Sequence, residues 1–369
     1  MDPTPSAQAA VEHVRPEVDA ALARHLEVLG AELSALGDAA PLVEQVAAIL
    51  TGGKRLRAAL CYWSWRAHGG DPADAAGRTA AVRTGAALEL FQSAALFHDD
   101  VMDGSDTRRG RPAAHRTFEA LHRSSAWSGP AERFGESAAI LLGDLALIAC
   151  DRELTAAVAD LPVPRGGAVR AVFDAMRTEV TVGQYLDVLA QALPWGEDPA
   201  DDERRAREVI RAKSARYSVE HPLVLGAALA DADAEHVDRC RQVGLPLGEA
   251  FQLRDDLLGV FGEPAATGKP AGDDLREGKR TVLVARAMGA ASPADRALVR
   301  EHLGRRDLTS DDVAALRDVL HRSGAVEAVE GLIAELSEPA LSALAAAPLA
   351  EPGRGMLVEL GRAAVHRQA

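Results

Sequence analysis

The sequence lacks long apolar runs, paired cysteines and an excess of basic residues. No run of 18 or more apolar residues occurs, and the N-terminus, MDPTPSAQAAVEH, has neither a basic nor an apolar leader region, so we expect no membrane span and no export signal. The three cysteines, Cys61, Cys150 and Cys240, lie far apart without CxxC spacing, which predicts reduced thiols in a cytoplasmic protein. The formal net charge of −14 argues against a nucleic-acid partner, because phosphates attract a basic face.

Helical periodicity, in contrast, runs through almost the whole chain. From Val14 onward apolar residues recur at steps of three and four, and long Ala- and Leu-rich segments continue the pattern. Turn signals interrupt it at HGGDP (68–72), WSGP (127–130), LPVPRGG (161–167), PWGEDP (194–199) and GEPAATGKPAG (262–272). No alternating pattern bounded by Asn-Gly or Asp-Gly turns suggests a sheet. We therefore predict an all-α protein, with residues 1–369 in a single helical domain.

An acidic cluster ends one of these helical segments, ELFQSAALFHDDVMDG. Asp99 and Asp103 stand at i and i+4 on one helix face, with Asp100 about 100° round the axis. Such a pair repels by a few tenths of a kcal/mol, roughly, a cost that a cation between the carboxylates would offset. Oxygen ligands that leave room for water and phosphate suit Mg²⁺. The alternative is a solvated acidic helix end, which the apolar flanking residues disfavour because an unpaired charge against a core is costly.

A second acidic pair, Asp255 and Asp256, follows another apolar helical run in FQLRDDLLG, with Gln252 one turn earlier. Gly259 stands where a third acidic residue would complete the spacing of the first cluster. Two such helices could face each other and hold several cations between them.

Basic residues cluster beside glycines and aspartates. They are Lys54, Arg57, Arg108, Arg109, Lys213, Lys269 and Lys279. Arginine forks and lysine charges are the groups that bind phosphates, although any one of them could equally be a solvated surface residue. No GxxxxGK[ST] loop is present, which disfavours a nucleotide kinase or GTPase. Acidic walls and cations together predict a metal-bridged polyphosphate site.

Six motifs in this order resemble those of the trans isoprenyl diphosphate synthases, or polyprenyl synthetases. They are GGKRLR, FQSAALFHDDVMDGSDTRRGRP, GQYLD, AKS, FQLRDD and GKPAGDDLREGKRT, and they lie between about Leu42 and Ala285. The resemblance implies a large helical bundle around a deep central cavity, assembled as a homodimer. It also implies condensation of isopentenyl diphosphate with an allylic diphosphate (dimethylallyl, geranyl or farnesyl), by Mg²⁺-assisted ionisation, condensation and proton loss.

The resemblance also assigns roles to individual residues. Asp99 and Asp103 would bind two Mg²⁺ ions and Asp255 a third, with Asp100 and Asp256 in support. The residues for isopentenyl diphosphate would be Lys54, Arg57 and Arg109. Those for the allylic diphosphate would be Arg108, Lys213, Gln252, Lys269 and Lys279. Three positions depart from the family pattern: Gln92 replaces a frequent histidine, Ser214 a threonine, and Gly259 the last aspartate of the second motif.

Product length should depend on the helix that precedes Asp99. Ala94 and Ala95 are too small to stop a growing prenyl chain, whereas Phe91 lies about 12 Å from Asp99 at 1.5 Å per residue. We expect Phe91 to help form the floor, with geranylgeranyl diphosphate as the main product; the alternative is that Phe91 is ordinary core.

Two other functions remain open at this stage. A class I terpene cyclase would need a late Asn/Ser/Glu metal motif, which we do not find. A catalytically silent subunit of a heteromeric synthase would have lost the first aspartate motif or the lysines, and both are present.

Overall fold

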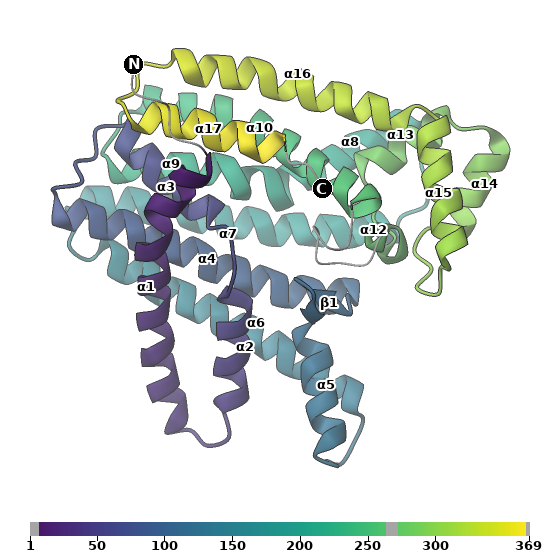
Figure 1. Cartoon of the computed structure of the whole chain (residues 1–369), viewed down its shortest axis with the longest axis horizontal. Helices are drawn as coiled ribbons and strands as arrows, with labels where there is room; N and C mark the ends of the chain where they lie inside the picture. The colour runs from purple at the N-terminus through teal and green to yellow at the C-terminus, as the bar shows by residue number, and fades with distance from the viewer. Residues whose placement is uncertain (1–6, 263–271, 367–369) are drawn as a thin grey trace.

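The computed structural model describes residues 7–262 and 272–366, which are almost entirely helical (Figure 1). The helices are α1 (Ala7–Ser34), α2 (Ala40–Leu50), α3 (Leu56–Ala67), α4 (Ala75–Asp103), α5 (Ala114–Ser124), α6 (Ala131–Val158), α7 (Val163–Ala192), α8 (Pro199–Val209), the π-helix η1 (Ile210–Glu220), α9 (His221–Leu229), α10 (Ala234–Phe261), α12 (Asp273–Glu277), α13 (Val282–Ala290), α14 (Pro293–His302), α15 (Ser310–Arg322), α16 (Ala325–Ala346) and α17 (Gly353–Val365). The all-α prediction is confirmed.

Helix α4 lies inside the bundle and carries the first acidic motif. It packs against α1, α3 and α6, and its buried face includes the small residues Ala81, Gly85 and Ala86. Small side chains allow neighbouring helices to approach closely, which accounts for the alanine-rich composition of this segment. The Asp74 side chain accepts a hydrogen bond from the Ala76 N–H at the start of α4, and Gly104 ends the helix at φ 62°.

Both acidic motifs lie at the C-terminal ends of their helices, α4 and α10. A helix C-terminus carries a partial negative charge, so a carboxylate there is unfavourable by about 0.3–1 kcal/mol. Asp103 is the last residue of α4 and Asp99 lies one turn before it, whereas Asp255 and Asp256 lie six and five residues before the end of α10 at Phe261. The helix dipole therefore disfavours the Asp103 carboxylate most, and a cation beside it offsets that cost.

The structure differs from the sequence prediction in two local features. Residues Thr107–Arg108 (β1) and Arg111–Pro112 (β2) form a small antiparallel hairpin. Arg109 and Gly110 turn the chain with φ of 54° and 72°, the conformation of a two-residue hairpin loop, so Arg-Gly here replaces the Asn-Gly or Asp-Gly signal. The break expected over 161–167 is also shorter, because α7 begins at Val163 with a proline in its first turn, where proline fits a helix.

Helices α16 and α17 cover one side of the bundle, while the α1–α2 pair and α5 project from the opposite side (Figure 1). The buried apolar residues form a contiguous core that extends from α1 to α17. Among the described helices, none is long and apolar enough to cross a membrane.

Candidate active site

A cavity of about 1140 Å³ brings the two acidic motifs together. Asp99 from α4 and Asp255 from α10 both line it, so the expected facing walls share one hollow. The predicted site residues that line the cavity are Lys54, Arg57, Gln92, Ala95, Asp99, Asp100, Arg108, Arg109, Lys213, Ser214, Gln252, Asp255, Asp256 and Lys279. Lys269 lies outside the described residues.

Lys213 binds the first acidic wall. Its Nζ lies 2.9 Å from Asp99 Oδ1 and 2.6 Å from Asp187 Oδ2, and the Gln184 amide donates to Asp99 Oδ1 at 3.2 Å. Burial alone would lower the pKa of Lys213, but the two carboxylates raise it above its ordinary value. Burial likewise opposes ionisation of Asp99, but Lys213 and other nearby cations hold the pKa of Asp99 below its ordinary range. Lys213 and Asp99 are therefore both charged at neutral pH.

The other two aspartates of this motif also pair with cations. Arg108 Nε donates to Asp100 Oδ1 at 2.8 Å, and Arg108 Nη2 lies 3.4 Å from Asp99 Oδ2. Asp103 does not line the cavity itself; its Oδ2 makes no hydrogen bond but lies 3.2 Å from Lys279 Nζ. Burial and the neighbouring Asp99 raise the pKa of Asp103 to about 6.

The second wall is held on α10. The Gln252 amide donates to Asp256 Oδ1 at 2.8 Å, which fixes the buried Asp256 side chain. Burial, with added repulsion from Asp274 and Asp255, raises the pKa of Asp256 to about 7. Asp255 beside it faces the cavity.

Arginines also line the cavity in and near the loop 51–55. The hairpin turn aims Arg109 at the end of α2, where its Nη1 donates to Ile49 O at 2.6 Å. Arg57 donates to Ser218 Oγ at 2.8 Å, and its guanidinium lies 4.2 Å from the centre of the Tyr217 ring. Helix α3 begins at Leu56, and Arg55 before it has a left-handed backbone with φ 54°. Lys54 therefore lies in the loop before the helix, and it does not share a helix face with Arg57. This arrangement presents several cations to one part of the cavity.

The π-helix η1 determines where Lys213, Ser214 and Tyr217 lie. Irregular helices of this kind are frequent at functional sites. Two glycines allow neighbouring helices to reach it: a Cβ at Gly183 in α7 would lie 2.4 Å from the backbone nitrogen of Lys213, and one at Gly248 in α10 would lie 2.2 Å from Ala215 O. The close approach of α7 brings Asp187 to Lys213.

The donor set fits a hard divalent cation that keeps part of its coordination for other ligands. Within residues 7–262 and 272–366, no three His, Cys, Asp or Glu side chains converge closely enough to hold a cation alone. The carboxylates are instead divided between two walls of a cavity that is also lined by lysines and arginines. Mg²⁺ is commonly bound by one or two carboxylates, waters and substrate phosphates. Asp99 and Asp255 line the cavity and could hold such ions, whereas Asp103, the third predicted ligand, is buried and paired with Lys279.

Sequence reasoning missed several residues of the site. Asp187 and Gln184 belong to the recognised motif GQYLD but were not singled out, and Tyr217 lies three residues beyond the recognised motif AKS. Conversely, Phe91 and Ala94 are buried and do not line the cavity. The Phe91 ring lies 5.3 Å from the Tyr217 ring, which does line it, so Phe91 stands behind Tyr217.

Fold and site together define an all-α protein in which two acidic motifs and several basic side chains line one cavity. A family profile described as polyprenyl synthetase matches residues 40–320, which extends beyond the recognised motifs into the C-terminal helices. The chain is 34% identical to geranylgeranyl diphosphate synthase of Mycobacterium tuberculosis over 296 residues, covering 80% of this chain and 75% of that protein. It is 32% identical to geranylfarnesyl diphosphate synthase of Aeropyrum pernix, covering 76% of this chain and 80% of that one.

A solved structure agrees with these sequence relatives. Geranylgeranyl pyrophosphate synthase of Corynebacterium glutamicum, crystallised with isoprenyl diphosphate and magnesium, superposes with a TM-score of 0.90 at 35% identity, covering 99% of this chain and all of that one. The chain belongs to the polyprenyl synthetase family. It is a trans-prenyltransferase.

Proposed function

We propose that this enzyme condenses isopentenyl diphosphate with an allylic diphosphate and releases geranylgeranyl diphosphate as its main product. One observation carries the proposal: Asp99 and Asp255 line the same cavity, together with basic residues from four separate parts of the chain. Two diphosphates bound side by side carry negative charge that several cations must balance. The departing diphosphate needs this most, because further negative charge develops on it in the transition state. A terpene cyclase would have no use for a second cationic group around Lys54, Arg57 and Arg109.

The two groups of cations suggest two subsites. Lys54, Arg57 and Arg109, with Gln92 as an amide donor, would hold isopentenyl diphosphate. Arg108, Lys213 and Lys279, with Ser214 and Gln252, would hold the allylic diphosphate beside the aspartates. Lys213 and Lys279 are already ion-paired to Asp99 and Asp103, so the site is held in place before substrates enter.

We assign Mg²⁺ to the acidic walls, with Asp99 and Asp103 on one side and Asp255 on the other. Bound Mg²⁺ would neutralise negative charge that develops on the departing diphosphate. The resulting allyl cation must be kept from water, and Leu96, Phe97 and Tyr217 provide an apolar lining close to the aspartates. We expect three ions per site, two on the first motif and one on the second.

Incubation of the purified enzyme with Mg²⁺, labelled isopentenyl diphosphate and each of the dimethylallyl, geranyl and farnesyl diphosphates tests this function. Chromatography of the products should show a major C20 diphosphate. A cyclic hydrocarbon, or no consumption of isopentenyl diphosphate with any primer, would contradict the proposal. Asp99→Asn and Asp255→Asn, which keep side-chain shape, should both abolish most turnover.

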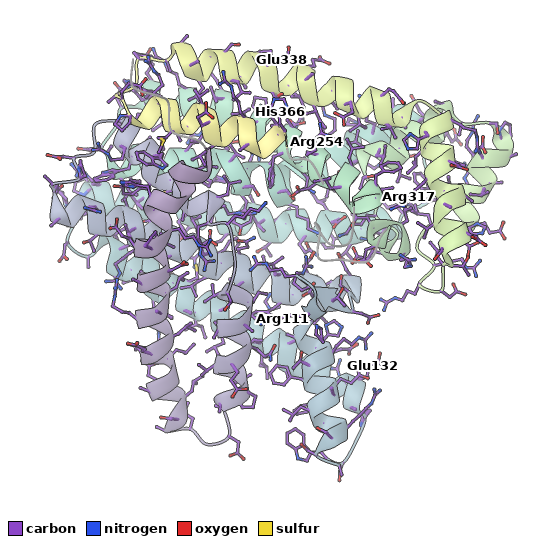
Figure 2. All side chains as sticks on the ribbon, in the orientation of Figure 1. Arg111, Glu132, Arg254, Arg317, Glu338 and His366 are labelled. Atoms are coloured by element: carbon purple, nitrogen blue, oxygen red, sulfur yellow. The ribbon has the colours of Figure 1, made fainter. Side chains whose placement is uncertain are left out.

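We also propose that the enzyme is a homodimer joined through α6 and α7. These adjacent helices expose apolar side chains that a second copy would cover: Ile140, Leu141, Ile148, Val182, Tyr185 and Val188. Leu141→Arg should shift the protein to monomer in light scattering. Glu338→Arg, on α16 at the outer edge of the molecule (Figure 2), is the control and should leave the assembly unchanged. A monomeric wild type would contradict this assignment.

A further inference from the structure

The loop that carries Lys54 is held in place by the arginine that follows it. Arg55 has a left-handed backbone with φ 54°, a conformation that is unfavourable for a residue with a side chain. Its guanidinium folds back against the loop: Nη2 donates to Leu50 O at the end of α2, and Nη1 lies 2.6 Å from the point that a Cβ on Gly53 would occupy. Arg55 therefore contacts the backbone at both ends of the short segment that leads into Lys54.

Two carboxylates from other helices hold this guanidinium. Arg55 Nε lies 2.8 Å from Asp19 Oδ1 on α1, and Arg55 Nη1 lies 3.1 Å from Glu89 Oε2 on α4. The Arg55 and Glu89 side chains are 5% and 3% exposed, and a charge buried to this degree needs a partner. Because two carboxylates already match its charge, Arg55 supports the loop and is not a ligand for an incoming diphosphate.

Three other cations of the same region have no such partner. Lys54, Arg57 and Arg109 make no ion pair with a carboxylate in the part of the chain that the structure describes. Arg109 donates to Ile49 O, the carbonyl next to the one that Arg55 holds, so both arginines meet at the end of α2. The position of Arg55 therefore influences where the unpaired cations present their charges.

Helix α1 brings Asp19 to this arginine by packing against the helices around the loop. It contacts α2, α3 and α4, and Val18, the neighbour of Asp19, is 0% exposed. A Cβ on Gly85, one turn before Glu89 in α4, would lie 3.6 Å from Val18. Helices α1 and α4 are therefore in contact close to the point where both of their carboxylates meet Arg55.

We propose that Asp19 is a positioning residue for isopentenyl diphosphate and acts through Arg55 on Lys54. The inference rests on the proposed function, because that function makes Lys54 a ligand of isopentenyl diphosphate. It gives a part in substrate binding to α1, which precedes the region matched by the family profile, residues 40–320. Loss of the Asp19 carboxylate leaves Arg55 with one carboxylate in place of two and loosens the loop in which Lys54 lies.

Positioning and simple charge repulsion predict opposite effects of removing Asp19. As a negative charge near the site, Asp19 repels a diphosphate, so its loss alone would strengthen binding. As a support for Arg55, its loss lets Lys54 leave the binding position, and a misplacement of about 1 Å can cost on the order of 100-fold. The direction of the change in KM therefore distinguishes the two roles.

Steady-state kinetics of Asp19→Ala with a saturating allylic diphosphate measures this direction. The KM for isopentenyl diphosphate should rise about 10-fold, while kcat and the KM for the allylic diphosphate stay within about twofold of wild type, because one binding group has moved. Asp19→Glu keeps the carboxylate and should return the KM to within about threefold of wild type. In a Lys54→Ala background, Asp19→Ala should raise the KM by less than about threefold, because the group on which it acts is already absent.

Glu17→Ala is the matched control. Glu17 lies on the same helix as Asp19 and forms a comparable pair with Arg78 of α4, at 2.6 and 3.0 Å. Its removal should leave the KM for isopentenyl diphosphate unchanged, because Arg78 does not contact the loop 51–55. The melting temperature of each variant shows whether the fold is intact. If Asp19→Ala is unstable, Asp19→Asn removes the charge while keeping the shape.

Two results would overturn the inference: an unchanged or lowered KM for isopentenyl diphosphate in Asp19→Ala, or a full further rise in the Lys54→Ala background. Failure of the proposed function is a separate outcome. It would appear as a wild-type enzyme that consumes no isopentenyl diphosphate with any allylic diphosphate.

Discussion

Removing the Phe91 ring should lengthen the product. Phe91 precedes Asp99 by eight residues on the continuous helix α4, a separation of about 12 Å. Its ring packs edge-on against Tyr217 at 5.3 Å and Phe173 at 6.4 Å. Tyr217 lines the cavity and Phe91 supports it from behind, so Phe91→Ala gives the Tyr217 ring space to move away from a growing chain.

The cost in stability provides an internal check that the space has formed. Phe91 is 3% exposed, and truncating a buried Phe costs about 3 kcal/mol or more. With an unfolding entropy of about 2.1 cal/mol/K per residue, 3 kcal/mol in a 369-residue chain lowers the melting temperature by about 4 °C. Phe91→Leu retains most of the volume and should lose less stability.

The assay is chromatography of the diphosphates made from farnesyl diphosphate and labelled isopentenyl diphosphate. Phe91→Ala should yield products at least one isoprene unit longer than wild type, whereas Phe91→Leu should not. Leu320→Ala, which truncates a core residue on α15, should lower stability without altering chain length. A Phe91→Ala enzyme that melts earlier but keeps the wild-type product distribution would refute the reasoning and leave Phe91 as ordinary core.

Two further predictions concern the charges of the site. Lys213→Met leaves Asp99 and Asp187 without their shared cation, so it should lower the melting temperature and reduce turnover at least about 100-fold. Adding Asp187→Asn should restore stability but not activity. Recovery of both would show that Lys213 is only structural. The second concerns pH. The pKa values of Asp103 and Asp256 rise to about 6 and about 7 in the folded protein, above their unfolded value. The folded state therefore binds more protons than the unfolded state in this pH range. As a result, the metal-free protein becomes less stable as pH rises through 6 to 7. The drop in melting temperature between pH 6 and pH 8 should therefore be smaller in Asp256→Asn than in wild type, and equal drops would contradict the assignment.

Much of the fold and many of the site residues could be predicted from the sequence. Helical periodicity is a local property, so it shows the all-α class directly. The acidic motifs and the basic residues beside glycines could be recognised because cation and phosphate binding need particular side chains at short, fixed spacings. Eleven of the cavity-lining residues could be named for this reason, Gln92 and Ser214 joined them through the family pattern, and Ala95 through the argument about product length.

What the sequence determined by itself is therefore the set of helices and the chemical groups they carry. Only the tertiary structure decided which groups meet. Asp187 reaches Lys213 because Gly183 lets α7 approach the π-helix, and Asp274 comes to lie against Gly259 although 15 residues separate them. These contacts join segments distant in the chain, and they depend on the packing of whole helices, which no local spacing reports.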